Sequence, residues 1–297
     1  MKDIVLYCKS YRRDVMRAKR LAESVRHFNS GDLLFYLSCP SADLPLFKDI
    51  IGSEGVTFLT DEEIVASNSS IKLQDLIMLP GGLSQQIVKS EFWRLGLCEN
   101  YLCIDSDAYF IRHFNKGDFL TPGGHPYTVI NESLDLRLFG ALHQHSKIAR
   151  NRDAECKAIM EIFGRTGRQY DFGPLPVVWS RRVWADLAEK HLEPRSMNFL
   201  DAIKFFPSEM RWYGEALLKF KSIELWPVET LFRCYHYEQQ FCDAKQSGET
   251  DETLSQIYLG VCSQSNWNKE LDYGQNRKGL LSRLNCAIKR RIFGRLV

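Results

Sequence analysis

The sequence predicts an α/β fold with a mixed, mainly parallel central sheet. In the first third of the 297-residue chain, short apolar runs alternate with stretches of helical periodicity, which is typical of βαβ units. One apolar run ends abruptly in two carboxylates, and beyond residue 117 the chain is broken by Gly- and Pro-containing segments. The second half is therefore expected to be mixed α+β.

The elements of the first half follow from the spacing of the apolar residues. We expect strands at 4–7, 33–37, 56–59 and 101–104, and helices at 14–28, 44–51 and 83–99. The last helix is followed directly by the strand that precedes the two carboxylates. Side chains at the carboxyl end of such a strand point into the crevice where open α/β sheets bind ligands.

The second half has a looser pattern. Helices are expected at 154–163, 181–190, 197–205 and 209–220, and strands at 177–179 and 233–237. The change in pattern divides the chain into 1–116, 117–272 and a tail at 273–297. Because no linker or repeat separates the first two parts, they are expected to be halves of one domain.

Composition excludes several classes of protein. The chain is 44% hydrophobic and 26% charged, as ordinary globular proteins are, and its first residues lack the features of a secretory signal, which predicts a cytoplasmic protein. Nine cysteines without a C-x-x-C pair indicate reduced thiols rather than a zinc site or disulfide framework. Subtracting the seven basic residues after Asp272 from the net charge of +2 leaves −5 on the body. A nucleic-acid-binding body is therefore not expected.

The two carboxylates are Asp105 and Asp107, separated by Ser106 and preceded by the apolar run 101–104. Hard oxygen ligands on a short turn suit Mg²⁺ or Mn²⁺, which keep several waters and bind substrate phosphates. The alternative is a solvated turn. Apolar residues on both sides of the pair favour the metal site.

These residues resemble the D-x-D segment of GT-A-fold glycosyltransferases, and the wider sequence, over about 4–237, is similar to bacterial glycosyltransferases of lipopolysaccharide and capsule loci. The matching features are the opening Tyr7, Lys9, Ser10 and Tyr11, the Gln85-Gln86-x-x-Lys89 helix, the D-x-D, a Pro- and Trp-containing segment before Ser180, and Ser208-Glu209-x-x-x-Tyr213-Gly214. The resemblance implies a GT-A-like fold, with a Rossmann-like nucleotide-binding half and an acceptor-binding half. It also implies transfer of a hexosyl unit from a nucleoside-diphosphate sugar, with UDP expected, to a glycan or lipid-linked glycan in surface polysaccharide synthesis.

The resemblance assigns donor-binding residues to three segments. The first loop supplies Tyr7, Lys9, Ser10 and Asp14, for which the alternative is helix capping and surface charge. Gln85, Gln86 and Lys89 lie within about one helical turn, so Gln85 and Lys89 share a face that meets either the donor or solvent. Asp105 and Ser106 complete the donor-binding set.

Metal and catalytic roles are assigned in the same way. Asp105 and Asp107 are expected to hold Mn²⁺ or Mg²⁺, with His236 as a third ligand or, alternatively, a core histidine between two tyrosines. Glu209, at the start of an expected helix, is the candidate general base, or else an acid that caps the helix. Glu215 is the second candidate. On a helix it lies about 240° further round the axis than Glu209, so the two side chains point in different directions.

Two alternative functions and one question about the tail remain at this stage. A haloacid-dehalogenase-like phosphatase also begins with a strand ending in D-x-D, but that family has Thr or Val where this chain has Tyr109. A catalytically silent carbohydrate-binding protein would keep the fold without turnover. In the tail, residues 278–296 have the spacing of a basic amphipathic helix, which would lie either on an anionic inner membrane surface, making the protein peripheral, or on the body.

Overall fold

The computed structural model describes residues 1–143 and 146–274. The basic helix predicted at 278–296, and with it the predicted membrane contact of the tail, lies outside the described residues. Ten strands are described, at β1 (Lys2–Lys9), β2 (Phe35–Cys39), β3 (Thr57–Thr60), β4 (Cys98–Asp105), β5 (Ala108–Phe110), β6 (Tyr127–Val129), β7 (Val177–Ser180), β8 (Trp226–Val228), β9 (Phe232–Tyr235) and β10 (Gly260–Ser263).

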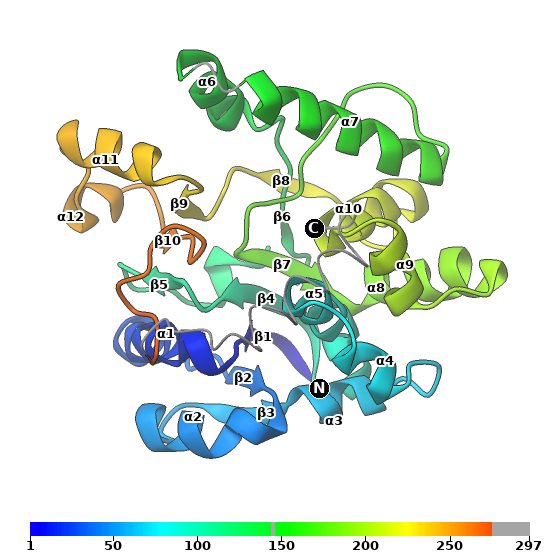
Figure 1. Cartoon of the computed structure of the whole chain (residues 1–297), viewed down its shortest axis with the longest axis horizontal. Helices are drawn as coiled ribbons and strands as arrows, with labels where there is room; N and C mark the ends of the chain where they lie inside the picture. Colours follow the sequence, from blue (N-terminus) through cyan, green and yellow to red (C-terminus); the bar gives the residue numbers. More distant parts are fainter. Residues whose placement is uncertain (144–145, 275–297) are drawn as a thin grey trace, which may run out of the picture.

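The α-helices of the described residues surround these strands (Figure 1). They are α1 (Val15–Phe28), α2 (Leu44–Ile51), α3 (Asp61–Ala66), α4 (Leu73–Ile77), α5 (Gly81–Glu91), α6 (Leu134–Leu142), α7 (Ser146–Phe163), α8 (Arg181–Leu187), α9 (Phe199–Phe205), α10 (Glu209–Phe220), α11 (Glu238–Gln246) and α12 (Asp251–Leu254). None of them is long and apolar enough to cross a bilayer.

The central sheet has the strand order β3-β2-β1-β4-β7. Its first four strands are parallel, whereas β7 runs antiparallel to β4. This mixed sheet confirms the predicted fold class. Because β7 comes from the second half of the sequence, the halves at 1–116 and 117–272 share one sheet. A second sheet, β5-β10-β9, follows the end of β4 and carries the chain toward α11 and α12.

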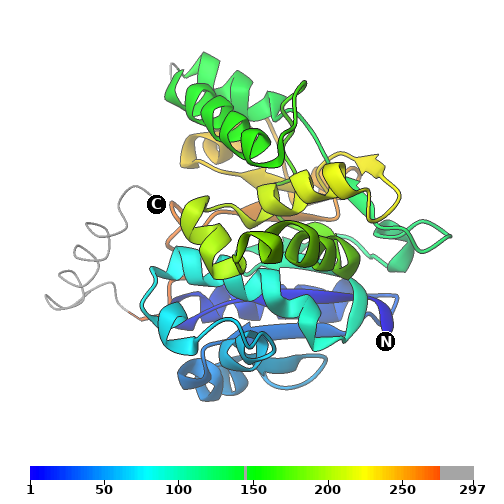
Figure 2. The same cartoon turned by 90° about the vertical axis from the view of Figure 1, so that its right-hand side faces the viewer.

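The two faces of the central sheet bury different helices because side chains alternate along a strand. On β1, Val5 and Tyr7 pack in the cluster that includes residues of α5, α8 and α10, whereas Leu6 and Cys8 pack against α1 and α2. Figure 2 shows these layers edge-on, with the α6–α7 pair at the end of the molecule farthest from α2. The sheet is therefore covered on both sides, and its carboxyl edge is left for a site.

Several predicted elements agree closely with the structure. The helices expected at 44–51 and 209–220 have those bounds. The helix expected at 83–99 is shorter, since α5 ends at Glu91 and a 3₁₀ turn reaches Gly96, whose φ of 66° ends the helical stretch before β4 begins. Strand β10, which lies between β5 and β9, has no counterpart among the predicted elements.

The carboxyl end of α5 holds a buried acid that makes stability depend on pH. Glu91 accepts hydrogen bonds from Asn68 Nδ2 (2.9 Å) and Arg94 Nε (2.7 Å). Burial raises the pKa of Glu91 to about 7 in spite of Arg94. The folded protein therefore binds this proton more tightly than the unfolded chain does, and the resulting stabilisation is full below the unfolded pKa of about 4.3 and lost as pH rises through about 7.

We expect the free energy of unfolding to fall by up to about 3 kcal/mol over this pH window because of Glu91. Glu91→Gln, which cannot ionise, should remove that part of the slope. Urea unfolding of both proteins between about pH 4.5 and 8 measures the difference. Parallel curves for the two proteins would contradict the assignment to Glu91.

Candidate functional site

A cavity of about 160 Å³ opens at the carboxyl edge of β1 and β4. Since the carboxyl ends of neighbouring parallel strands lie at the same edge, loops distant in sequence meet there. The lining residues are Lys9, Tyr11, Asp14, Gln85, Asp105, Ser106, Asp107, Gln264, Ser265 and Asn266. Six of them, Lys9, Asp14, Gln85, Asp105, Ser106 and Asp107, are residues to which the sequence analysis assigned a role. The structure thus brings three predicted segments to one cavity.

The two aspartates differ in environment. The side chain of Asp105 is 37% exposed. Asp107 is buried, and its Oδ2 accepts a hydrogen bond from the backbone N–H of Ser265 at 2.8 Å. Burial and, second, the charge of Asp105 raise the pKa of Asp107 to about 7. A cation bound between the two carboxylates would relieve both effects on Asp107.

Lys89 enters this site from α5 as a buried cation. Its Nζ lies 2.5 Å from Asp105 Oδ1 and 3.6 Å from Glu209 Oε1. Although burial alone would lower the pKa of Lys89, these two carboxylates raise it, so the side chain is charged. Lys89 is therefore turned toward the site, and the solvated helix face that was the alternative for this residue is excluded.

Glu209 starts α10 as predicted, but it does not line the cavity. Its side chain is buried behind Lys89, and burial raises the pKa of Glu209, with Lys89 acting in the opposite direction. Ser208, which precedes α10, makes no side-chain capping bond. A general base must reach the acceptor hydroxyl, so the geometry favours an action of Glu209 through Lys89.

Glu215 is held away from the cavity by Arg165. The guanidinium donates from Nε to Oε2 (2.5 Å) and from Nη2 to Oε1 (2.7 Å), and the carboxylate is buried. This bidentate pair joins α10 to the segment after α7. The candidate catalytic role of Glu215 is corrected to a structural one, because both of its oxygens are engaged.

We expect Glu215→Gln to lower the free energy of unfolding by on the order of 3 kcal/mol, as breaking a buried ion pair does. Nucleotide binding at the cavity should be unchanged. The double variant Glu215→Gln/Arg165→Met should recover part of the lost stability, because it removes the unpaired cation. A stable Glu215→Gln protein that has lost turnover would restore the catalytic assignment.

The first loop is arranged differently from the prediction. Tyr7 is fully buried, with its ring stacked on Phe92 at 3.8 Å, so it cannot stack on a nucleotide. Ser10 is buried as well, and among the described residues its hydroxyl has no hydrogen-bond partner. The exposed ring at the cavity is Tyr11, which is 40% exposed. Tyr11 belongs to the motif but was not assigned a role.

Lys9 and Asp14 line the cavity but are already paired. Lys9 Nζ lies 3.1 Å from Asp61 of α3, and Asp14 accepts a bond from Arg17 at 2.5 Å. On α5, Gln85 reaches the cavity, whereas Gln86 donates to the carbonyl of Gly82 one turn earlier. The donor-binding role predicted for Gln86 is therefore not supported by its position.

One wall of the cavity comes from a segment that the sequence did not single out. Gln264, Ser265 and Asn266 line the cavity, and the chain then crosses the start of α1. There Asp272 accepts bonds from Arg13 and Arg17, with distances of 2.6 Å to each guanidinium. The segment 264–272 is thus fastened at both ends, to Asp107 and to α1. Its sequence has no periodicity that would have revealed this position.

His236 lies beside the cavity but does not line it. It borders a second cavity, and its Nδ1 is 3.1 Å from Nε2 of Gln264, which does line the first one. Among the described residues no group of three or more His, Cys, Asp or Glu side chains is arranged to hold a metal ion. The structure therefore does not bring His236 together with Asp105 and Asp107 as a ligand set.

Asp105 and Asp107 nevertheless suit a hydrated ion. Mg²⁺ and Mn²⁺ are commonly bound by one or two carboxylates plus water and substrate phosphate. The raised pKa of Asp107 is the observation that fits this role, because burial and, second, the charge of Asp105 disfavour its ionised form, which a nearby cation would favour. The competing observation is Lys89, which already binds one oxygen of Asp105.

Two residues of the Ser208–Gly214 motif have structural roles. The hydroxyl of Tyr213 accepts a hydrogen bond from the backbone N–H of Ser180 at 2.8 Å, which ties α10 to the end of β7. A Cβ on Gly214 would lie 2.0 Å from the ring of Phe172, so glycine permits the close contact between α10 and that loop. This part of the motif therefore positions α10.

Comparisons with known proteins give the family of the chain and similar solved structures. The model of a family described as "Family of unknown function (DUF6492)" matches residues 3–281. No curated protein sequence matches the chain.

Among solved structures, mouse xyloside xylosyltransferase 1 in its apo form is similar. The two chains are 8% identical and have a TM-score of 0.50, over 89% of this chain and 99% of that one. The galactosyltransferase LgtC with donor and acceptor sugar analogues gives 9% identity and a TM-score of 0.48 over 96% and 95%. The chain has the GT-A-like fold that its sequence predicted.

Proposed function

We propose a function from the geometry of the site, because the chain belongs to a family described as of unknown function, DUF6492. Membership of that family therefore does not identify a reaction. We propose that the protein is a glycosyltransferase that moves a sugar from a nucleoside-diphosphate sugar to a glycan or lipid-linked glycan. The observation that carries the proposal is the cavity that Asp105, at the end of β4, and Asp107 line together with Lys9, Tyr11 and Gln85.

Each wall of the cavity has a part in the proposed reaction. The exposed ring of Tyr11 stacks on the nucleotide base, and the cavity side of α5 contacts the diphosphate. Asp105 and Asp107 would hold Mn²⁺ or Mg²⁺, which when bound would supply positive charge against the leaving diphosphate. Lys89 adds a buried positive charge beside Asp105, where negative charge develops on that leaving group.

The acceptor half of the proposal follows from the second cavity. It measures about 550 Å³ and is separated from the first by His236 and Gln264. Tyr170 and Tyr258 supply aromatic faces, and Asn131 and Gln240 supply amides, which is the mixture that binds sugars by stacking and hydrogen bonds. We place the reaction in surface polysaccharide synthesis at the cytoplasmic face of the membrane.

A second candidate is a carbohydrate-binding protein without turnover. It is favoured by the ion pair of 2.5 Å between Lys89 and Asp105, because this pair occupies an oxygen that the metal would use. Such a protein would bind nucleotide or sugar but would not hydrolyse a donor in the presence of Mn²⁺.

The test is a thermal-shift series of nucleoside diphosphates with and without Mn²⁺. A ligand at 100 times its dissociation constant stabilises a protein by about 2.7 kcal/mol, and UDP with Mn²⁺ is expected to raise Tm most. Absence of a shift with every diphosphate and metal would contradict donor binding. A shift without hydrolysis of any nucleotide sugar would favour the silent binding protein.

A further inference from the structure

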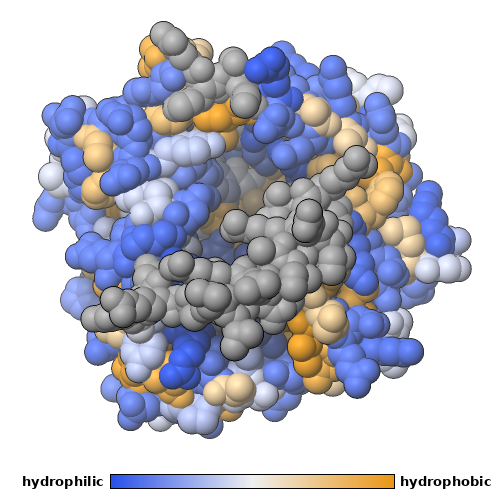
Figure 3. Space-filling view, viewed as in Figure 1, coloured by the Kyte–Doolittle hydropathy of each residue, from blue (hydrophilic) through white to orange (hydrophobic). Residues whose placement is uncertain are grey.

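Helix α6 carries a stripe of exposed leucines. Leu134, Leu138 and Leu142 are 67%, 59% and 70% exposed. Their spacing of four residues places them on one side of the helix, within an arc of about 80°. We call these three residues the α6 leucine stripe. Figure 3 shows apolar side chains at the upper edge of the molecule, where Figure 1 places α6.

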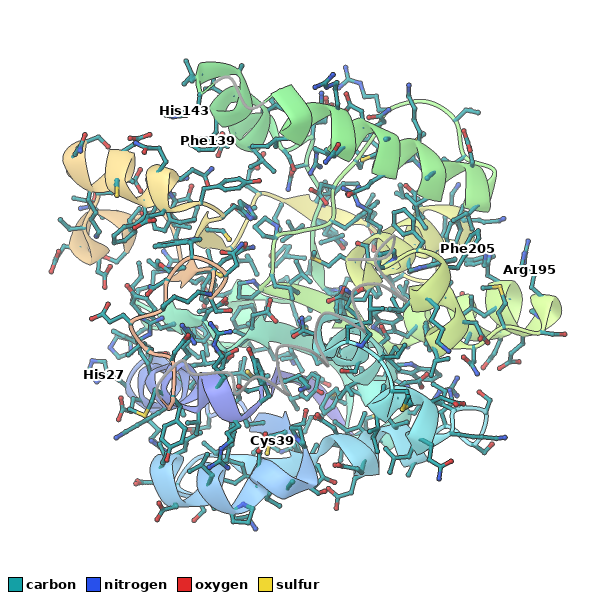
Figure 4. The ribbon with its side chains drawn as sticks, in the orientation of Figure 1. His27, Cys39, Phe139, His143, Arg195 and Phe205 are labelled. Carbon is teal, nitrogen blue, oxygen red and sulfur yellow. The ribbon has the colours of Figure 1, made fainter. Side chains whose placement is uncertain are left out.

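The other side of α6 attaches the helix to the protein. Phe139 is buried and stacks on Tyr237 at 5.3 Å, and His143 Nε2 lies 3.2 Å from Asp243 of α11. Figure 4 shows Phe139 and His143 on the side of α6 that faces α11. The helix is therefore fixed by one side, and this orients the leucine stripe outward.

The stripe begins at the second cavity. Leu134, Asp135 and Leu136 all line that 550 Å³ space, so the first turn of α6 forms part of its wall. Ile257, which is 72% exposed, lies at an adjoining hollow that Asp135 also lines. A cavity with a mixed polar and apolar lining thus opens beside the exposed apolar side chains of the α6 leucine stripe, with Ile257 at the adjoining hollow.

The size and charge of the stripe distinguish between occupants. Together the three leucines expose about as much surface as two fully exposed leucines would. A stable protein interface needs about 800 Å² from each partner, which is much more. Interfacial insertion of a helix requires only one apolar side on the bilayer. The helix carries one acid and one base, Asp135 and Arg137, so its contact with lipid would be apolar rather than electrostatic.

We propose that the α6 leucine stripe inserts into the surface of a lipid bilayer and presents the second cavity to a saccharide carried by a lipid of that bilayer. The exposed leucines are the observation that supports the bilayer contact, whereas the choice of acceptor rests on the proposed function. The acceptor class is accordingly a lipid-linked glycan, whose sugar enters the cavity while its hydrocarbon stays in the membrane. This contact is separate from the tail, because it does not require anionic lipid.

The experiment is co-sedimentation of the full chain with vesicles of phosphatidylcholine alone. It is performed at about 1 M salt, where the Debye length of about 3 Å suppresses attraction by basic segments. The wild-type protein is expected to partition onto these vesicles. Leu134→Gln/Leu138→Gln/Leu142→Gln should partition at least tenfold more weakly, because partly exposed leucines would no longer leave water on binding. Gln keeps good helix propensity.

The matched control is Ile77→Gln/Met78→Gln at the end of α4, where the two side chains are 63% and 67% exposed. It should partition like the wild type. The single variant Leu138→Gln serves if the triple variant does not fold, and it should show a smaller loss in the same direction. The proposal is overturned if the wild type does not bind the vesicles, if stripe variant and control behave alike, or if the stripe substitutions only dissociate a dimer.

A separate readout distinguishes this proposal from the proposed function. The shift of Tm by UDP with Mn²⁺ should be the same in the wild type and the stripe variant, because the donor cavity lies on the opposite side of His236 and Gln264. Vesicle binding that depends on the stripe, with no nucleotide shift in any protein, would contradict the donor site and the lipid-linked acceptor but retain the bilayer contact. A nucleotide shift of Tm without stripe-dependent vesicle binding would retain the donor site and overturn the bilayer contact.

Discussion

Asp107→Asn is expected to abolish metal-dependent nucleotide binding. The substitution keeps the shape of the side chain and an oxygen that accepts the bond from Ser265, but it removes the charge that a divalent ion needs. Affinity for UDP with Mn²⁺ should fall at least about a hundredfold, which corresponds to about 2.7 kcal/mol. Titration calorimetry with and without Mn²⁺ measures this loss.

Alanine would be a poorer choice at this position. Asp107 also accepts the backbone N–H of Ser265 and contacts Cys262, whose Sγ is 3.4 Å from Oδ1, so its removal would disturb β10. Asp61→Asn is a suitable control, because Asp61 is also buried and pairs with Lys9 beside the same cavity. That variant should keep its Mn²⁺ dependence. Unchanged Mn²⁺ dependence in Asp107→Asn would refute the metal assignment.

Lys89→Met should affect both stability and donor turnover. Removing Lys89 leaves Glu209 buried without its cation, and breaking such a pair typically costs about 3–5 kcal/mol. Donor turnover is expected to fall at least about a hundredfold, since the positive charge beside Asp105 is lost. Urea unfolding and donor hydrolysis measure the two effects on the same protein.

The double variant Lys89→Met/Glu209→Gln separates the two effects. It should regain most of the stability, because no buried charge remains unpaired, but donor hydrolysis should stay low. Glu209→Gln alone tests the catalytic assignment of that residue. A fall in kcat with unchanged donor KM would indicate a general base. If both constants change, Glu209 acts through Lys89. Full turnover in Lys89→Met would show that Lys89 is not needed.

The sequence predicted the parts of the site that depend on local pattern. An apolar run followed by Asp105 and Asp107 can be recognised without tertiary information. The apolar residues indicate a buried strand, and the two carboxylates mark the place where it ends. The helical spacing predicted that Gln85 and Lys89 share a face but left open whether it meets the donor or solvent; in the structure Gln85 lines the cavity and Lys89 contacts Asp105. Helical geometry also separated Glu209 from Glu215, and their partners, Lys89 and Arg165, lie in different places.

Other features depend on packing between distant segments. Tyr7 and Tyr11 are both aromatic residues of the opening motif, yet only contact with Phe92 decides that Tyr7 belongs to the core. The burial of Glu209 depends on where α10 meets α5, which local spacing does not encode. Segment 264–272 was missed for the same reason, since its position is fixed by ion pairs with Arg13 and Arg17.

The fastening of segment 264–272 has a consequence for synthesis on the ribosome. The ion pair between Arg13 and Asp272 joins residues 259 positions apart, and Ser265 completes the wall around Asp107. Chains emerge from the amino end at about 5–20 residues per second, so the central strands and their helices are exposed for many seconds before this wall exists. The central sheet is complete only after β7 has been made. From then until residue 272 emerges, the nascent protein has its sheet but an incomplete cavity, and it acquires competence for its ligand only when this last part of the domain leaves the exit tunnel.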